Sequence, residues 1–465
     1  MPIRLKLLSL VFFVFFASLI SKLFYWQIIR AKDLKVQARY QYKSESAVSA
    51  PRGNILASDG SLLAAKTDAW LIFASIPELK RPNKDIANLL APFFVDDPSI
   101  KDDVLAEVDR LVNLISKREV VWVPLKQRIT NEVKNTIENL KIEGIGFEKQ
   151  EARFYPEASS AAQLLGFVGK DLEGQDQGYF GLEGYYNLPL SGKPGFLAHE
   201  KDAKGTAIVT DKTKEVSAIG GVDLFTHVDK SVQLTLDKRL KDAIEKYGAR
   251  GGTAIVMNPK NGAILGMSSY PSYDPSKYWE WSDEFFKNPA ISFTFEPGSI
   301  FKVLIMASAL DAGVVTPDTK CDICDGPVRV DKYKIETWNN KYFPDSTITD
   351  VIIHSDNVGM IFVGQKLGAE ALYDYLDKFA IGKPTAIDLQ GEVSPKLRPK
   401  ETWNIVDLAT ASFGQGVAVT PIQMIKAVAA IANGGVLVTP QVVGKLVGDA
   451  WENDVKPQVG ERVIS

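Results

Sequence analysis

The most hydrophobic part of the chain lies close to its amino terminus. From Leu7 to Ile29 few polar residues interrupt the apolar ones, and the stretch is long enough for a helix that crosses a bilayer. Arg4 and Lys6 precede it, which predicts that the short amino terminus stays in the cytoplasm. Because no small-x-small cleavage site ends the stretch, we interpret it as an uncleaved anchor rather than a signal peptide. The residues that follow are then expected outside the cytoplasmic membrane.

Beyond the anchor the period of the hydrophobic pattern changes several times. Arg30 to Ser49 is polar and predicts a helix that leads out of the membrane. Two apolar runs flank Asp59-Gly60, a pair typical of the tight turn of a β-hairpin. Lys101 to Arg118 and Ile129 to Leu140 are predicted to be amphipathic helices. None of these segments offers a paired acid and base or a cluster of metal ligands.

The second half of the chain mixes strand and helix patterns. Arg153 to Gly195 is rich in glycine and tyrosine, which predicts tight turns in a packing and hinge region. Val232 to Leu236 alternates like a strand, and Lys238 to Tyr247 is helical in pattern. Gly252 to Met257 and Ala263 to Met267 flank a turn cluster, which predicts a second hairpin. A long helix-rich segment follows, and helices beside antiparallel strands indicate the α+β class.

Composition and charge narrow the class of protein. A chain of 465 residues predicts two or three domains, and 24% charged with 45% hydrophobic residues is typical of a globular protein. The net charge of −3 gives no basic surplus for nucleic acid. Cys321 and Cys324 could form a small disulfide outside the cytoplasm or remain free thiols, and two ligands alone do not make a structural zinc site. A redox role is less favoured, because no thioredoxin-like pattern surrounds them.

One stretch carries candidate chemistry. A Pro-Gly pair precedes Ser299, and the apolar run from Ile300 to Leu310 ends near Gly313, where a C-cap glycine is expected. Ser299 therefore falls in the first turn of a helix, with Lys302 on the same face. A buried lysine can accept the proton of a serine hydroxyl, because desolvation lowers the pKa of an amine. Taken alone, Ser-x-x-Lys also describes a capping serine followed by a solvated lysine.

A second motif, Ser355-Asp356-Asn357, changes the weight of the first. Ser-x-x-Lys followed by Ser-Asp-Asn is found in penicillin-binding proteins and class A β-lactamases. With the other motifs of the chain, the likeness extends over nearly the whole length, and the chain resembles a class B penicillin-binding protein. The motifs that carry the resemblance are Pro51-Arg-Gly-Asn-Ile-Leu56, Asp59-Gly60, Arg153-Phe-Tyr-Pro156, Gly166-Phe-Val-Gly169, Gly181-Leu-Glu183, Leu234-Thr-Leu-Asp237, Glu296-Pro-Gly-Ser-Ile-Phe-Lys302, Ser355-Asp-Asn357, Phe413-Gly-Gln-Gly416, Val419-Thr-Pro-Ile-Gln423 and Ala432-Asn-Gly-Gly435.

The resemblance implies a peptidoglycan D,D-transpeptidase that needs no metal or organic cofactor. Ser299 would be the nucleophile that attacks the D-Ala–D-Ala bond of a stem peptide, and β-lactams would acylate the same serine. Lys302 would accept the serine proton, and Ser355 would relay a proton. Asn357 would hold the substrate amide and Lys302, while the backbone N–H of Ser299 would be one oxyanion donor.

The resemblance also implies an organisation and a location. Residues 1–30 would form the cytoplasmic tip and anchor, 31–225 an elongated non-catalytic pedestal or dimerisation domain, and 226–465 the transpeptidase domain, with helices packed on an antiparallel sheet. The protein would cross the bacterial cytoplasmic membrane once, with its bulk on the extracytoplasmic side. Ser412 to Pro421 is similar to the cell-division or sporulation branch. That branch implies a polytopic membrane glycosyltransferase and division proteins as partners, besides peptidoglycan stem peptides and β-lactams, and no nucleic acid.

One motif of the family is missing. Its members carry Lys-Thr-Gly on a strand beyond the Ala-Asn-Gly-Gly region, whereas this sequence stops at Ser465 without it. Lys204-Gly-Thr has the wrong order and precedes the nucleophile. We therefore expect a transpeptidase domain that is incomplete at the C-terminus and impaired in activity, although the parent protein is an enzyme. Reading the coding DNA past codon 465 tests this expectation.

Two other functions stay open at this point. A chain without the third motif could act as a non-catalytic scaffold or sensor in cell division through its anchor and pedestal. A serine β-lactamase is less favoured, because such enzymes resemble the catalytic domain alone and would leave Arg52 to Gly195 without a role. Turnover of a β-lactam, in place of a lasting adduct, would distinguish that function.

Overall fold

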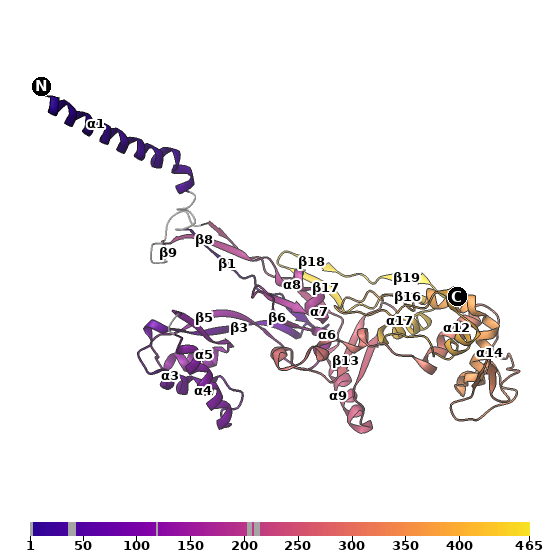
Figure 1. The fold of residues 1–465 in the computed structure, drawn as a ribbon. Coiled ribbons are helices and arrows are strands. Elements are labelled where there is room, and N and C mark those ends of the chain that lie inside the picture. The colour runs from indigo at the N-terminus through magenta and orange to yellow at the C-terminus, as the bar shows by residue number, and fades with distance from the viewer. Residues whose placement is uncertain (1–2, 36–42, 118–119, 202–206, 209–213) are drawn as a thin grey trace. The chain divides into compact units, whose positions relative to one another are not determined.

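The computed structural model describes residues 3–35, 43–117, 120–201, 207–208 and 214–465, which divide into two compact units (Figure 1). The first unit comprises Met1–Pro51 and Gly192–Gly220. The second comprises Arg52–Ser191 and Gly221–Ser465. The chain therefore leaves the second unit after Ser191 and returns to it at Gly221.

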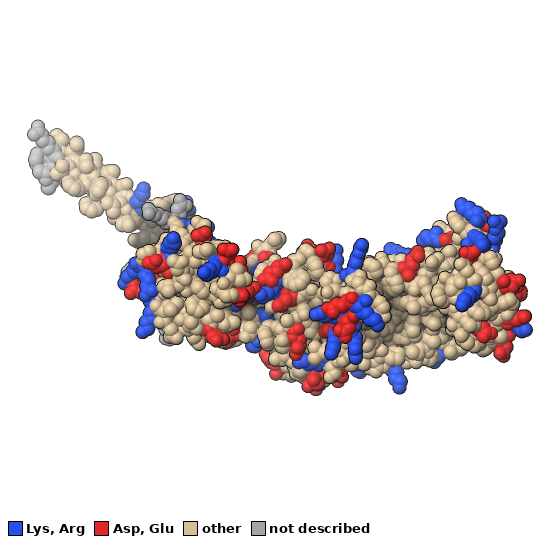
Figure 2. Space-filling view, turned by 90° about the horizontal axis from the view of Figure 1, so that it is seen from below, with Lys and Arg blue, Asp and Glu red and all other residues tan. Residues whose placement is uncertain are grey.

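The first unit begins with the predicted apolar helix, α1 (Ile3–Phe24), continued by the π-helical turn η1 (Tyr25–Ile29). Within the part of the chain that the structure describes, Leu7–Ile29 is the one helical stretch long and apolar enough to span a membrane, with a mean hydropathy of 2.3. Its surface is almost free of charged side chains in Figure 2, whereas acidic and basic side chains are interspersed on the visible face of the second unit. The helix fits a single-pass membrane anchor.

A strand replaces part of the helix predicted after the anchor. β1 (Lys43–Val48) pairs antiparallel with β8 (Gly195–Lys201), so the prediction of a helix from Arg30 to Ser49 is wrong over β1, and residues 36–42 lie outside the described residues. The partner strand comes from a distant part of the sequence, and its backbone hydrogen bonds override the local polar pattern. Two further strands pair with β8, namely β9 (Ala207–Ile208) and β10 (Lys214–Val216).

The second unit is built on a sheet whose strands come from both halves of the chain. Their order is β18-β17-β11-β2-β3-β4, and β5 also pairs with β3. The hairpin predicted at Asp59-Gly60 is confirmed, because β2 and β3 pair antiparallel with Ile55 opposite Ala64. β11 joins the two halves, since it pairs in parallel with β2 and antiparallel with β17. The strands are β2 (Ile55–Leu56), β3 (Leu62–Ser75), β4 (Trp122–Ile129), β5 (Ile145–Phe154), β11 (Asp223–Thr226), β17 (Val443–Gly448) and β18 (Trp451–Asp454).

Three helices pack against β3, β4 and β5, around a hydrophobic core that includes Ile72 and Leu111. Both amphipathic helices predicted for this region are present. The second one begins where Thr130 caps it, by accepting a hydrogen bond from the Val133 N–H at 3.3 Å. The helices are α3 (Asn83–Leu90), α4 (Lys101–Ile115) and α5 (Asn131–Asn139).

A helix, α9 (Lys230–Tyr247), occupies the segment Val232 to Leu236 for which a strand was predicted, so that prediction is wrong. The Asp229 carboxylate caps the helix by accepting from two backbone N–H groups. Val232 and Leu236 are four residues apart, and both lie against Gly266 on the neighbouring strand. Their spacing therefore fits one face of a helix as well as the alternation of a strand. The hairpin predicted next is confirmed as β12 (Gly252–Met257) and β13 (Ile264–Tyr270).

The helix-rich part packs around one hydrophobic cluster that includes Phe301, Leu304, Met360 and Val363. With the antiparallel strands of the unit, it gives the mixed architecture expected for the α+β class. The helices are η5 (Gly298–Phe301), α12 (Lys302–Asp311), α13 (Ile348–Ile353), α14 (Asn357–Leu367), α15 (Ala369–Lys378), α16 (Ile405–Ala411) and α17 (Pro421–Ala432), with the small strand pairs β14 (Val328–Val330) with β15 (Tyr333–Ile335) and β16 (Val436–Val438) with β19 (Val459–Arg462).

The two cysteines lie in the connection between α12 and α13. Cys321 and Cys324 form a disulfide, so the first of the alternatives left open by the sequence is the one present. Both are buried, and the Cys321 N–H donates to the Ser346 carbonyl at 2.9 Å. The disulfide therefore closes a local turn under the helices.

Motifs that are far apart in the first half of the sequence meet in one buried ion cluster. The Glu183 side chain, which is 0% exposed, accepts from the Arg52 Nε at 2.8 Å and from the Arg153 Nε at 2.6 Å. Arg52 also donates to Asn187, and Arg153 to the Gly53 carbonyl. The segment that begins at Arg153, predicted to serve packing, thus ties β5 to α7 (Gly181–Tyr185).

A second buried carboxylate connects α7 to the helix-rich half. Asp388 lies in the loop after α15, and it accepts from the backbone N–H groups of Val442 and Val443 at 2.6 and 2.8 Å. The Tyr186 hydroxyl donates to it at 2.9 Å. Burial raises the pKa of the Asp388 carboxyl. Gln390, two residues on, exchanges hydrogen bonds with Phe180 and Gly181.

Candidate active site

Ser299 lies in the turn of 3-10 helix η5, directly before α12. Its side chain is exposed, and its Oγ makes no hydrogen bond to any residue that the structure describes. The next turn is anchored by Phe301, which is fully buried. A free hydroxyl at the amino end of a buried helix is open to an incoming substrate, and the helix dipole favours negative charge there.

Two glycines allow the loop before Ser299 to approach a distant segment closely. Gly298 has φ +57°, and its N–H donates to the Gly414 carbonyl at 2.9 Å. Gly414 has φ +81°, and a Cβ at this position would lie 2.1 Å from the Gly298 carbonyl oxygen. Any other residue at 414 would therefore push the nucleophile loop away.

The same segment fixes the loop at two more points. The backbones of Phe295 and Val419 exchange two hydrogen bonds of 3.0 Å, and the Gly416 N–H donates to the Glu296 carboxylate at 3.0 Å. The loop before Ser299 is therefore held at Phe295, Glu296 and Gly298. The sequence showed the Phe413-Gly-Gln-Gly416 motif, and three-dimensional contact was needed to place it beside Ser299.

Lys302 is buried at the start of α12, with 2% of its surface exposed. Its Nζ donates to the Ser355 carbonyl and to Asn357 Oδ1, both at 2.7 Å, and to Ser355 Oγ at 3.2 Å. All three acceptors are neutral. Burial lowers the pKa of Lys302 to about 8, while the charge of Asp356 opposes that shift.

The turn between α13 and α14 presents Ser355 and Asn357 to that amine. Ser355 has φ +50°, a left-handed conformation that a non-glycine residue adopts only when its surroundings impose it. Asp356 caps α14, since its Oδ1 accepts from the N–H groups of Val358 and Gly359 at 2.8 and 3.3 Å. The cap and the left-handed residue together turn the side chains on either side of Asp356 toward Lys302.

Three of the four candidate residues from the sequence thus meet at one atom, the Nζ of Lys302. Ser299 lies one turn earlier on the solvent side, and its carbonyl accepts the backbone N–H of Lys302. Asp356 was not singled out as a functional residue. An aspartate directly before an apolar helical run is a sequence signal for an N-cap, which could have drawn attention to it.

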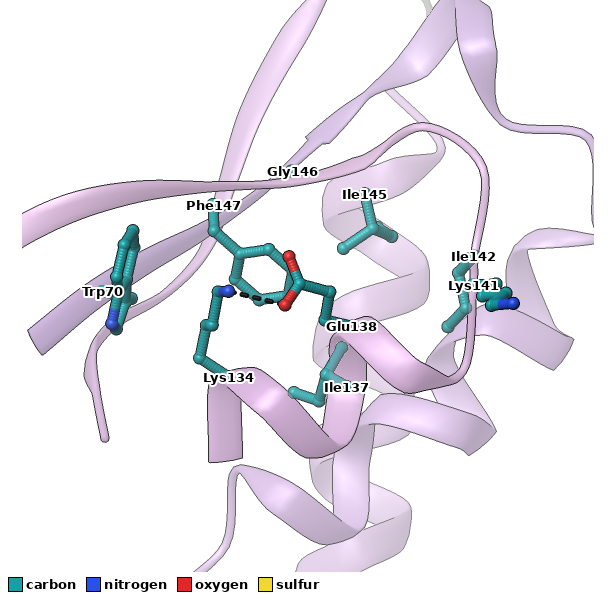
Figure 3. Close-up of a pocket in the computed structure, with 9 residues that line it drawn as sticks. All are labelled: Trp70, Lys134, Ile137, Glu138, Lys141, Ile142, Ile145, Gly146 and Phe147. Atoms are coloured by element: carbon teal, nitrogen blue, oxygen red, sulfur yellow. Dashed lines mark hydrogen bonds and ion pairs between the residues drawn. The ribbon is translucent and has the colours of Figure 1, made fainter. Parts of the chain in front are cut away.

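Among residues 3–35, 43–117, 120–201, 207–208 and 214–465, no group of three or more histidine, cysteine or acidic side chains is arranged to hold a metal ion. A cavity of about 400 Å³ lies elsewhere, between α5, β3 and β5 (Figure 3). Lys134 projects into it, paired with Glu138 at 2.6 Å and 5.1 Å from the centre of the Trp70 ring. With its cation already paired and no activated nucleophile, this cavity is a weaker candidate than the Lys302 site.

Comparisons with known proteins agree with this geometry. Residues 252–465 match the penicillin-binding protein transpeptidase domain, and residues 47–226 match the penicillin-binding protein dimerisation domain. The chain is 32% identical to stage V sporulation protein D of Bacillus subtilis, over 98% of this chain and 69% of that protein. It is 30% identical to the peptidoglycan D,D-transpeptidase FtsI homolog of Mesostigma viride, over 95% of this chain and 73% of that protein.

Solved structures have a similar fold. The crystal structure of penicillin-binding protein 2X from Streptococcus thermophilus aligns with a TM-score of 0.71 at 24% identity, over 91% of this chain and 64% of that one. A peptidoglycan synthetase from Bifidobacterium adolescentis aligns with a TM-score of 0.66 at 26% identity, over 91% of this chain and 79% of that one.

Proposed function

Because the chain belongs to the class B penicillin-binding proteins, which have transpeptidase function in cell-wall synthesis, we propose that Ser299 is the nucleophile of a peptidoglycan D,D-transpeptidase. The observation that carries the proposal is the state of Lys302. Its amine is buried among neutral oxygens, one helical turn from an exposed serine. With a pKa of about 8, roughly a tenth of it is neutral at pH 7, which suits a proton acceptor.

The reaction follows from this arrangement. Ser299 Oγ attacks the carbonyl carbon of the penultimate D-Ala, and the serine proton passes to Lys302. The C–N bond breaks, the terminal D-Ala leaves as an amine that takes up the proton, and an ester with Ser299 remains. An amine from a neighbouring stem peptide then attacks the ester, forms the cross-link and returns the serine oxygen its proton.

Two further residues have proposed roles in these steps. Ser355 Oγ lies 3.2 Å from the Lys302 Nζ, within reach to relay the proton to the leaving amine. Asn357 fixes Lys302 through its Oδ1, and its Nδ2, which donates to the Glu336 carbonyl at 3.3 Å, is placed to exchange that partner for a substrate amide. The Ser299 N–H would donate to the oxyanion.

We propose that residues 31–465 lie on the extracytoplasmic side of a bacterial cytoplasmic membrane, with residues 1–30 as tip and anchor. The Cys321–Cys324 disulfide supports that location, because disulfides persist in oxidising compartments. Residues 31–225 would be the pedestal and 226–465 the transpeptidase domain. The similarity to a sporulation protein supports a role in the division or sporulation branch, with a polytopic glycosyltransferase as partner.

The test is acylation by a fluorescent penicillin, followed on a denaturing gel and by peptide mass spectrometry. We expect a lasting adduct on Ser299, formed slowly because the sequence carries no Lys-Thr-Gly motif, and its loss in Ser299→Ala. Ser308→Ala is the matched control, because Ser308 lies in α12, the helix that follows Ser299, and its hydroxyl donates to the Leu304 carbonyl. Absence of any adduct on the wild-type protein would overturn the proposal, and rapid turnover of the β-lactam would favour a β-lactamase.

A further inference from the structure

Asp356 is a buried carboxylate that the proposed mechanism does not use. It is 2% exposed, and only one of its two oxygens has a role, as the cap of α14. The other, Oδ2, is buried and has no hydrogen-bond donor among the residues that the structure describes. A carboxylate oxygen without a donor is costly in a protein interior unless a cation lies near it.

The cation available to Asp356 is Lys302. The two residues that flank Asp356 in the sequence both accept hydrogen bonds from the Lys302 Nζ, so the backbone of this turn lies beside the amine. The charge of Asp356 also raises the pKa of Lys302, against the effect of burial. The pair makes no direct hydrogen bond, so the interaction is one of charge across a buried turn.

The other ionisable groups on the elements around α14 have partners of their own. They are Asp350 with Thr347, His354 with Phe343, Glu336 with Lys334, Asp407 with Arg398, Asp311 with Tyr375, Lys366 with Phe362, Glu370 and Asp374 with Lys400, Tyr373 with Trp403, Asp377 with Lys383, and Lys378 with Tyr375. None of them is hydrogen-bonded to Lys302, whose amine donates only to Ser355 and Asn357 among the described residues.

We propose that Asp356 is a positioning residue that keeps Lys302 charged in the resting site and thereby sets the pH above which Ser299 can be activated. The inference rests on the proposed role of Lys302 as proton acceptor. Burial alone would release the proton of Lys302 at lower pH, and the carboxylate counteracts it. In the resting site the charged amine then donates its three hydrogen bonds to Ser355 and Asn357. Only those protein molecules in which Lys302 has lost a proton can accept the proton of Ser299.

Asp356→Asn separates charge from structure. Asparagine is as good an N-cap as aspartate, so its Oδ1 can still accept from Val358 and Gly359 while the charge is gone. We expect the midpoint of the pH–rate profile for penicillin acylation to move down by about one pH unit, with the rate at high pH retained. Asp350→Asn is the matched control, because that carboxylate caps α13 and does not act on Lys302.

A second readout does not depend on acylation. In protein labelled at the lysine ε-carbon, NMR titration gives the pKa of Lys302, assigned by the resonance lost in Lys302→Arg. We expect the same downward shift in Asp356→Asn and none in Asp350→Asn. If circular dichroism shows that Asp356→Asn is misfolded, Asp356→Ser takes its place in the experiment, because serine also offers an uncharged N-cap oxygen.

The outcomes separate the two proposals. Normal acylation of the wild type with an unchanged pH midpoint and an unchanged Lys302 pKa in Asp356→Asn overturns the inference and leaves the transpeptidase proposal intact. No acylation of the wild type overturns the transpeptidase proposal, and the NMR titration still decides whether Asp356 sets the charge of Lys302.

Discussion

Two clusters of buried charged side chains in the described part of the chain are built in opposite ways. In the part of the chain that matches the dimerisation domain, Glu183 lies between Arg52 and Arg153 with ion pairs of 2.6 Å to both. At the candidate active site, Lys302 is equally buried, yet its three hydrogen bonds go to neutral oxygens. The first cluster pairs each guanidinium directly with the carboxylate, and the second has no carboxylate bonded to its ammonium.

The two clusters show that a buried charge can serve either to stabilise the fold or to perform chemistry. A paired and hydrogen-bonded ion cluster keeps its groups ionised and ties chain segments together. An ammonium without a bonded anion has its proton loosened by desolvation, which is a requirement for a base and a disadvantage for stability. A lysine with a lowered pKa beside an exposed serine is therefore a better guide to the site here than the density of buried charge.

The largest effect is expected at the chemical site. Lys302→Met should lower the acylation rate of Ser299 by about 10²–10⁴-fold, the usual contribution of a positioned base. Stopped-flow or gel-based acylation with a fluorescent penicillin measures it. A rate close to that of the wild type would show that another group accepts the serine proton. Burial of Lys302 would then have no role in the chemistry.

The next effect belongs to the ion cluster. Glu183→Gln leaves two buried guanidinium groups without their anion, so we expect a loss of about 3–5 kcal/mol in the free energy of unfolding. At a permissive temperature the folded fraction should acylate at the wild-type rate. Chemical denaturation and acylation of the same sample check both statements, and a slowed acylation step would instead make the cluster part of the chemistry.

The pH dependence of stability sharpens the comparison further. Lys302 has a pKa of about 8 in the folded protein against an ordinary value of 10.5, so between these values the unfolded chain binds more protons. Stability therefore rises with pH across this window, and the gain relative to Lys302→Met should reach about 3 kcal/mol by pH 10.5. A constant difference between the two proteins from pH 8 to 10.5 would contradict the lowered pKa.

Smaller losses of stability are expected from a single buried hydrogen bond and from an exposed ion pair. Tyr186→Phe removes one hydrogen bond to Asp388 and should cost about 1 kcal/mol of stability. Glu143→Gln breaks an exposed pair with Lys80, whose side chains are 59% and 76% exposed, and should change stability by less than about 0.5 kcal/mol. Thermal unfolding of both variants ranks them. An equal loss in both would mean that burial does not decide the worth of a polar contact here.

Local patterns were sufficient for elements that are stabilised by their own sequence. The anchor helix, the hairpin at Asp59-Gly60 and the amphipathic helix at Lys101 were predicted because composition, turn residues and period each act within a few residues. The prediction of a strand at Val232 was wrong because its five residues fit the period of a strand and that of a helix equally well. The Asp229 cap stabilises the helix.

Long-range contacts account for what was missed. The motifs at Arg52, Arg153 and Glu183 were visible singly, but only the fold brings them to one cluster. The contact of Gly414 with the loop of Ser299 depends likewise on packing between distant segments. The roles of Ser299, Lys302, Ser355 and Asn357 stay predictions, and the structure places Ser355 and Asn357 around the Lys302 amine.

The strand β11 has a practical consequence for recombinant expression. A gene fragment that starts at residue 252, where the match to the transpeptidase domain begins, would encode β17 without its neighbour Asp223–Thr226. An uncovered strand edge invites pairing between molecules, so such a fragment should be prone to aggregation. Inhibitor screening against the catalytic half is better served by a fragment that retains β2, since β11 in turn needs Ile55 and Leu56 beside it.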